Sequence, residues 1–482
     1  MSRKHHSHGH HINLFTPGLP PQTLTPHAYI NLPDKEALVS EFRGKSLTHL
    51  RTPALVIDRA TFAENCARMH KRALKLGTGF RTAEGIRLQL KSSASETHSV
   101  VVSTLTEAWG ILHAGLVADG TVNDILYGLP ISPAKIADLH MFRTALSTYG
   151  AVLRLMVDHP YQVRALEAFD REHPTTNPSL SRWNIFIKLD VGTNPSSRRA
   201  GVTPLSTELN GLLDTCIPSA SVSVHGFYAH AGHSYASTSQ DQAASNLHTE
   251  LSAVNAAAGQ AIPKYHAHGL PEPAFVLSVG ATPTAHAVSG DNIQVPNPLN
   301  GAIELHAGNY PMLDSQQLAT NLVRDQDVSQ RVLASIASYY TGRGDGDEAM
   351  CDVGAIGMSK DSGPIPGFGK VVNILREGER IVWRPRETGW TLGRISQEHG
   401  ILTRTNKCAP EEEHDILRLG DVVGKFDGSS PALRLLSVQI QAIVGQHACL
   451  TAAGHPWYYI VDSKDESKGS KVVDVWVPWK GW

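Results

Sequence analysis

The feature that most constrains the fold is an alternation of short apolar segments with amphipathic helical segments between residues 52 and 306. Strands that alternate with helices in this way are typical of a parallel sheet covered by helices. The predicted strands are 54–58, 100–103, 125–128, 153–157, 184–189, 222–227, 275–279 and 303–306. So many units in about 260 residues predict a closed (β/α)8 barrel, whose functional groups lie where the strands end.

The predicted barrel has a weak point near its beginning. Helices are expected at 61–76 and 82–90, and no apolar strand separates them. A parallel crossover needs a strand at this place, because the backbone groups of each strand pair with both neighbours. The sequence therefore predicts a barrel that is damaged at its second strand.

The pattern changes after residue 315 to strands separated by turns. Strands are expected at 381–384, 401–405, 444–449, 457–462 and 472–477, with one helix at 325–340. We therefore predict an α/β chain with a barrel domain over residues 31–315 and a β-rich C-terminal domain over residues 316–482. Residues 1–30 are rich in His and Pro and predict a disordered polar tail, with loose metal binding as the alternative.

Composition limits the partners and the compartment. A length of 482 residues exceeds one ordinary domain, and a net charge of −2 argues against nucleic acid or a membrane surface as the partner. Five cysteines, an odd number in a long chain, do not make a disulfide framework, so a reducing, cytoplasmic location is expected. No apolar run reaches the length that a bilayer requires.

A candidate metal site consists of His447 and Cys449. If the segment is a strand, residues at i and i+2 face the same side, so the imidazole and the thiolate can bind one soft divalent ion. A structural zinc site usually takes four ligands, so a pair that leaves positions open indicates a catalytic site. The alternative is a packed histidine beside a buried cysteine that acts as a small hydrophobe.

Three segments that follow predicted barrel strands carry candidate binding groups. Gly280, Ala281 and Thr282 follow one strand, where backbone N–H groups and hydroxyls could hold a phosphate, although a plain turn is the alternative. Arg199 follows another strand and could contact a cofactor, or could be an ordinary surface arginine. The segment 225–235 is dense in His and Tyr, which suits stacking or acid–base chemistry.

The chain resembles the eukaryotic D-serine dehydratase family and, more distantly, D-threonine aldolase and alanine racemase. The likeness rests on strings that occur in a shared order: TPALVID, VVSTLTEAWG, DILYGLP, GFYAHAGHSY, SVGATPT, ELHAGNY, SQEHG, HACLTAAGHPWYYIVD and VWVPWKGW. Members of this family are fold-type III enzymes that use pyridoxal 5′-phosphate, with an N-terminal barrel and a C-terminal β domain. The resemblance implies a homodimer whose substrate is D-serine.

The resemblance also implies roles for particular residues. His447 and Cys449 would bind zinc (Zn2+), and the cysteine favours a dehydratase because an Asp stands there in the aldolases. The cofactor would be bordered by Arg199, Tyr228 and Tyr235, and its phosphate held by Gly280, Ala281 and Thr282. The implied reaction eliminates water from D-serine and yields pyruvate and ammonia, with the cofactor as electron sink and zinc as Lewis acid.

The sequence departs from the family in two places. The family's Schiff-base lysine lies on a strand for which this chain has no counterpart, because about seven residues are absent between Arg81 and Thr82. A second anomaly is an insertion over residues 424–441. A retained intron together with a lost coding segment explains both, and a true pseudoenzyme is the rival hypothesis. The chain as written is expected to be inactive; the alternatives are a D-threonine aldolase, another enzyme of D-amino acids, or a non-catalytic protein.

Overall fold

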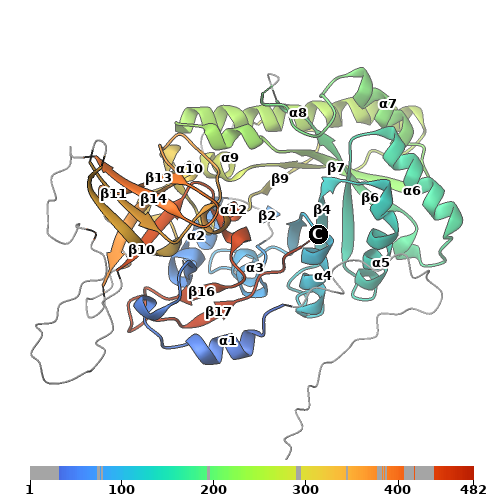
Figure 1. Cartoon of the computed structure of the whole chain (residues 1–482). Helices are drawn as coiled ribbons and strands as arrows, with labels where there is room; N and C mark the ends of the chain where they lie inside the picture. The colour runs from blue at the N-terminus through green and yellow to red at the C-terminus, as the bar shows by residue number, and fades with distance from the viewer. Residues whose placement is uncertain are drawn as a thin grey trace, which may run out of the picture.

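The computed structural model describes residues 32–72, 76–77, 80–192, 196–288, 295–343, 346–376, 383, 385, 388–405, 417 and 439–481. The predictions for the tail 1–30 and for the insertion as far as residue 438 lie outside these residues. The described chain has two parts, a barrel wrapped by helices and a large mixed sheet beside it (Figure 1).

The barrel consists of parallel strands that close on themselves in chain order from β2 to β9. The strands are β2 (Leu76–Gly77), β3 (Ser99–Val102), β4 (Asp124–Pro130), β5 (Val152–Val157), β6 (Trp183–Leu189), β7 (Val222–Ala229), β8 (Val276–Val279) and β9 (Ala302–His306). The helices between them include α3 (Ala83–Leu90), α4 (Leu105–His113), α5 (Ile136–Ser147), α6 (Pro160–Glu172), α7 (Thr207–Cys216) and α8 (Gln240–Ala267).

The prediction of a barrel without its second strand needs a correction. A strand stands at the weak point, but β2 has only two residues, and these pair with Ser99 on one side and with Leu305 and His306 on the other. Because β2 is so short, the seven longer strands β3–β9 form most of the wall. Helix α3 begins at Ala83, as predicted, with Thr82 as its N-cap.

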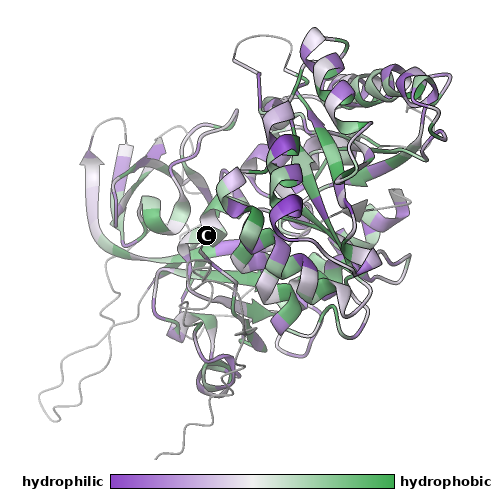
Figure 2. Cartoon of the chain, turned by 90° about the vertical axis from the view of Figure 1, so that its right-hand side faces the viewer, coloured by the Kyte–Doolittle hydropathy of each residue, from purple (hydrophilic) through white to green (hydrophobic). Residues whose placement is uncertain are grey.

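Apolar side chains fill the barrel at its centre, so that it is a packed core and not a pore. One interior cluster consists of Leu126, Met156, Phe186, Tyr228 and Val276, one residue from each of five neighbouring strands. Figure 2 shows strands that are mainly hydrophobic and outer helices that carry hydrophilic residues toward solvent. Near the carboxyl ends of the strands, polar side chains replace the apolar ones inside the barrel.

The second part is a nine-stranded sheet in the order β11-β14-β13-β12-β15-β10-β1-β16-β17. Its strands are β1 (Ala54–Asp58), β10 (Gln330–Arg343), β11 (Gly346–Cys351), β12 (Gly369–Leu375), β13 (Thr391–Ile395), β14 (Gly400–Thr405), β15 (Ile440–Gly445), β16 (Tyr458–Val461) and β17 (Asp474–Trp476). Helices α1 (Lys35–Phe42), α10 (Ser315–Ala319), α11 (Ala355–Met358) and α12 (Ala448–Gly454) accompany it, and α2 (Arg59–Arg72) follows β1.

Two sequence predictions fail in this sheet. The strand 54–58 was expected in the barrel, but β1 pairs antiparallel with β10 and parallel with β16. The helix expected at 325–340 is a short 3₁₀ turn, Asp325–Asp327, followed by strand β10. The first five residues of β10 are all buried, and a buried strand has no polar alternation that would distinguish it from a helix. The division of the chain at residue 315 stays a prediction. Strand β1 precedes that residue but belongs to the nine-stranded sheet, whose other strands all follow it.

Candidate active site

The residues His447 and Cys449 lie at the start of α12, which follows β15 where the sheet faces the barrel (Figure 1). The expectation that they share a strand is wrong, because β15 ends at Gly445 and His447 is the N-cap of α12. The Thr451 hydroxyl donates to the Met358 carbonyl at 2.9 Å, and this contact holds the new helix against α11. The two candidate ligands nevertheless stay neighbours, because the side chain of Cys449 is hydrogen-bonded to His447.

A buried carboxylate holds the same segment against the barrel. Asp314 is fully buried and accepts a hydrogen bond from the Ala448 N–H at 2.8 Å. Its other oxygen caps α10 by accepting from the Gln317 N–H at 3.0 Å. Asp314 therefore fixes the backbone between the two candidate ligands.

The imidazole of His447 is oriented by Asp361, whose carboxylate lies 3.2 Å from Nδ1. The Gln316 amide donates to the same carboxylate oxygen at 3.0 Å and so fixes Asp361 in turn. A carboxylate only accepts hydrogen bonds, so Nδ1 carries a proton and Nε2 is the nitrogen that a metal ion would bind. A carboxylate behind a histidine in this way is the usual support of a metal-binding imidazole.

The Cys449 side chain is exposed, which contradicts the alternative of a buried hydrophobic cysteine. Burial lowers the pKa of His447, but the hydrogen bond and the charge of Cys449, together with Asp314 and Asp361, raise it to about 9. Within the described residues, no group of three or more His, Cys, Asp or Glu side chains could hold a metal. The donor set fits an open site with two protein ligands, and not a closed structural one.

Tyr235 connects this pair to the barrel. It lies in the 3₁₀ helix Gly232–Ala236 after β7, and its ring stacks on His447 with 5.4 Å between centroids and 17° between planes. Burial raises the pKa of Tyr235 above its ordinary value. Hydrogen bonding to the side chain and backbone of Thr282 offsets only part of this increase. One side chain therefore contacts both the candidate metal pair and the candidate phosphate segment.

The candidate phosphate segment turns sharply from β8 into α9 (Thr282–Ala287). Gly280 has φ +140°, and a Cβ there would lie 2.1 Å from the carbonyl oxygen of His306, so this backbone approach requires glycine. Thr282 is fully buried, and its hydroxyl accepts from the Asn309 N–H at 3.0 Å. These residues are small and stand at a helix N-terminus, which suits an anion, so Gly280, Ala281 and Thr282 fit a phosphate. We call these three residues the phosphate cradle.

Beside the phosphate cradle, Tyr228 and His306 stack face to face across the barrel mouth, with 4.0 Å between ring centroids and 10° between planes. Ser278 lies 3.1 Å from Nδ1 of His306, whereas Nε2 is buried and has no hydrogen-bond partner among the described residues. Burial also lowers the pKa of His306 well below its ordinary value, so the ring is neutral. A buried nitrogen without a partner fits a site that a polar ligand completes.

Two cationic side chains come from β6, which neighbours β7, and from the segment that follows β6. Lys188 is buried 5.0 Å from the centre of the Tyr228 ring, and burial lowers its pKa to about 8. Arg199 is exposed, and its guanidinium donates to the Arg198 carbonyl at 2.9 Å, while its Nε lies near Gly232. The structure therefore places Arg199 beside the segment that carries Tyr235.

Several residues of the site have no signal in the sequence. Asp314 and Asp361 lie 135 and 88 positions before Cys449, and single aspartates at such distances form no motif. Glu250, in the middle of α8, is fully buried behind the phosphate cradle and was not predicted. A search for buried carboxylates requires the fold first, because sequence alone does not reveal burial. No helix among the described residues has the length and hydrophobicity needed to traverse a bilayer.

Comparisons with known proteins agree with this geometry. The family described as "Putative serine dehydratase domain" matches residues 329–461. The chain is similar to D-serine dehydratase of Schizosaccharomyces pombe, with 38% identity over 465 residues that cover 94% of this chain and 97% of that protein. It is also similar to D-serine dehydratase of Saccharomyces cerevisiae, with 31% identity over 92% of this chain and 99% of that protein.

A solved structure of similar fold is D-threo-3-hydroxyaspartate dehydratase from Delftia sp. HT23. It has a TM-score of 0.67 and 26% identity, and covers 91% of this chain and 100% of that one. A cysteine-to-alanine mutant of that dehydratase, solved in a metal-free form, has a TM-score of 0.66 with the same identity and coverage.

Proposed function

The chain belongs to the D-serine dehydratase family of lyases, and on that premise we propose that it holds pyridoxal phosphate and zinc at the barrel mouth to act on D-serine. The reaction is elimination of water, which leaves pyruvate and ammonia. The observation that carries the proposal is the double contact of Tyr235 with His447 and with Thr282, because it joins the metal pair and the phosphate cradle in one site.

The metal part of the proposal rests on His447 and Cys449. The imidazole offers Nε2 while Asp361 holds Nδ1, and the thiol faces solvent, so a substrate oxygen has room beside the ion. Zinc bound there supplies a Lewis acid that makes the hydroxyl of the substrate a better leaving group. A relative of similar fold, D-threo-3-hydroxyaspartate dehydratase, was solved as a cysteine-to-alanine mutant in a metal-free form, which supports a metal site in that relative.

The cofactor part rests on the phosphate cradle, on Tyr228 and on Tyr235, with Arg199 as a further bordering residue. When bound, pyridoxal phosphate supplies an electron sink for the loss of the α-proton. The neutral His306 offers an unpartnered nitrogen toward the same mouth, and its stack on Tyr228 fixes the plane of both rings. These residues would orient a flat ligand.

The lysine that would bind the cofactor covalently is the missing component. Between β2 and the end of α3 the chain contains no lysine, and Arg81 is followed directly by Thr82. We therefore propose that the chain as written binds cofactor and metal but turns over D-serine poorly or not at all. A D-threonine aldolase or another enzyme of D-amino acids is the alternative activity, and a non-catalytic binding protein is the alternative class. A cytoplasmic homodimer stays part of the proposal.

Two assays on the purified chain test the proposal. The chain mixed with pyridoxal phosphate and zinc should bind both, but borohydride should not attach the cofactor covalently at the site, since that attachment needs a reactive lysine. A second protein with the family's lysine segment inserted between Arg81 and Thr82 should be labelled covalently at that lysine after borohydride and should release pyruvate from D-serine, and a chelator should abolish the release. Failure of both proteins to bind the cofactor would contradict the proposal.

A further inference from the structure

Glu250 lies at the meeting point of the two loops that form the site. It comes from the middle of α8, the long helix that packs against β7 and β8, and its side chain is fully buried. Its carboxyl oxygen accepts a hydrogen bond from the Ala231 N–H at 2.5 Å, in the loop that leads to Tyr235. Its second oxygen is buried without a hydrogen-bond partner among the described residues, and Gly280 and Thr284, where β8 turns into α9, lie close enough to influence the carboxyl.

Burial disfavours a negative charge on Glu250 more strongly than the neighbouring hydrogen-bond donors and the charge of Lys188 favour it. No lysine, arginine or histidine forms an ion pair with it within the described part of the chain, and Lys188 on β6 acts only as a more distant charge. Of the other titratable groups around it, Tyr228 on β7 is protonated and buried, and burial lowers the pKa of His230 to about 4. His233 in the 3₁₀ helix Gly232–Ala236 bonds Asn246 instead. Burial raises the pKa of Glu250 to about 7, so the neutral and charged forms both exist near neutral pH.

We propose, on the basis of the function proposed above, that Glu250 is a positioning residue: its carboxyl holds the loop after β7 in place beside the turn after β8 and so shapes the phosphate cradle. A phosphate dianion in the cradle repels a carboxylate behind it, because charges interact strongly in a buried environment. Ligand binding therefore retains the proton on Glu250, and the affinity for phosphate-bearing ligands falls as Glu250 ionises.

The probe that isolates this effect is 4′-deoxypyridoxine 5′-phosphate, which carries the phosphate but lacks the aldehyde. Its binding does not depend on any lysine, and quenching of tryptophan fluorescence reports it. For the wild-type chain we expect affinity to fall about tenfold between pH 6 and pH 8, because that is the linkage of a group whose pKa is about 7 in the free protein. Glu250→Gln, which keeps the acceptor for Ala231 and cannot ionise, should lose this fall.

Glu167→Gln is the matched control. Glu167 lies on α6, away from the phosphate cradle, and its carboxylate accepts a hydrogen bond from the Ser219 hydroxyl. This variant should keep the wild-type profile, and Lys188, which titrates in the same range, is present in all three proteins. Deoxypyridoxine without phosphate should show no difference between wild type and Glu250→Gln. Calorimetry of the wild type in buffers of different ionisation enthalpy should detect uptake of most of one proton per ligand at pH 7.5.

Parallel pH profiles for wild type and Glu250→Gln, or binding without proton uptake, would overturn the role of Glu250 and leave the proposed function intact. Absence of binding by the wild type at every pH would instead overturn the proposed function and this inference together.

Discussion

At the scale of single residues, Asp361 decides which nitrogen of His447 is free for a metal. Its carboxylate lies 3.2 Å from Nδ1, and the Gln316 amide prevents it from turning away. Without Asp361 the ring would lose both its orientation and the charge that increases the basicity of Nε2.

Asp361→Asn should therefore weaken zinc binding about 10- to 100-fold, since an amide orients the ring less firmly and carries no charge. Competition with a chromophoric chelator measures the affinity. Asp465→Asn serves as the control, because Asp465 bonds only Ser467 and neighbouring backbone in a distant turn. Equal affinity in wild type and Asp361→Asn would show that this carboxylate does not support the metal.

The sequence points to the candidate ligands of this site more directly than to the residues that support them. His447 and Cys449 are close in the chain, and Gly280 stands after a recognisable strand, so local reasoning could find them. Asp314, Asp361 and Glu250 reach the site only through tertiary contacts between elements far apart in sequence. No local pattern predicts a buried carboxylate, because its spacing reflects the fold and not a motif.

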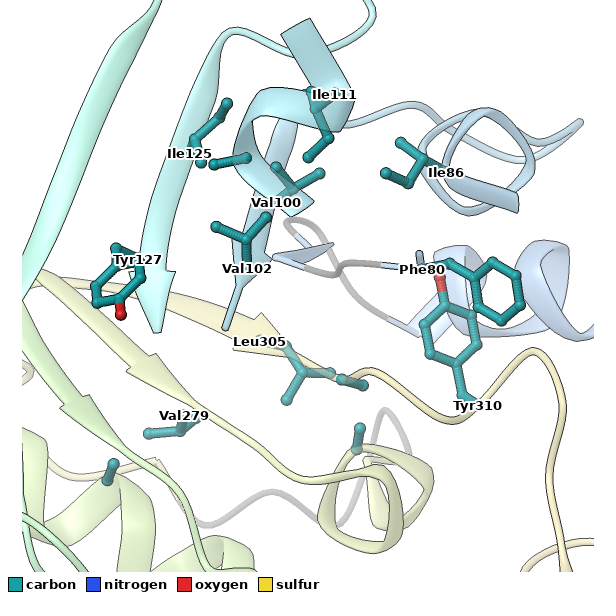
Figure 3. Close-up of a cluster of buried hydrophobic side chains, with 14 of the residues drawn as sticks. Phe80, Ile86, Val100, Val102, Ile111, Ile125, Tyr127, Val279, Leu305 and Tyr310 are labelled. Atoms are coloured by element: carbon teal, nitrogen blue, oxygen red, sulfur yellow. The ribbon is translucent and has the colours of Figure 1, made fainter. Parts of the chain in front are cut away.

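At the scale of elements, an aromatic cluster anchors the chain just after β2, the shortest strand of the barrel. The Phe80 ring contacts Phe62, Tyr458 and Trp476 at centroid distances of 5.1, 6.2 and 6.3 Å. Figure 3 shows Phe80 beside Tyr310, with Ile86 nearby. The cluster joins α2, the start of α3 and the nine-stranded sheet, and it compensates for the few hydrogen bonds that a two-residue strand provides.

Phe80→Ala should lower the free energy of unfolding by about 3–5 kcal/mol, the cost of removing a buried aromatic ring and leaving a cavity. Urea unfolding followed by fluorescence measures the change. Tyr149→Ala should change it by no more than about 0.5 kcal/mol, because Tyr149 is 54% exposed. A loss at Phe80 as small as that at Tyr149 would mean that the cluster does not stabilise this region.

Elements with clear periodicity follow the prediction, and those whose burial depends on other parts of the chain do not. Helices α3 and α4 and strands β3–β9 stand where alternation predicts them. Strand β1 leaves the barrel because β10 and β16, more than 270 residues away, offer it partners on both sides. Strand β10 does not follow the predicted helix, because complete burial of its first five residues removes the alternation of polar and apolar residues there.

At the scale of the whole molecule, acid should unfold the protein partly through its buried histidines. Burial lowers the pKa of His455 to about 4, while Nε2 donates to the Gly357 carbonyl at 2.8 Å. Between pH 6.5 and pH 4 the unfolded chain binds a proton that the folded chain refuses, so stability is full above this window and falls as the pH drops.

His455→Gln should remove on the order of 3 kcal/mol of that fall, because glutamine does not titrate. Unfolding free energies measured in urea at several pH values between 4 and 7 test this for both proteins. Parallel curves would assign the acid sensitivity to other groups.

The molecule as a whole brings two parts of the chain to one site. The barrel supplies the phosphate cradle, and the segment after the sheet strand β15 supplies the candidate metal ligands His447 and Cys449. The site therefore exists only when both parts are folded and in contact. The central claim is that the imidazole and thiol at the start of α12 bind zinc there.

The most direct test is the metal content of the purified chain after exposure to zinc and exhaustive dialysis. Mass spectrometry of the elements should find about one zinc ion per chain in the wild type, and almost none in folded His447→Ala or Cys449→Ser, because a single remaining ligand binds too weakly. Unchanged zinc content in both variants would contradict the account.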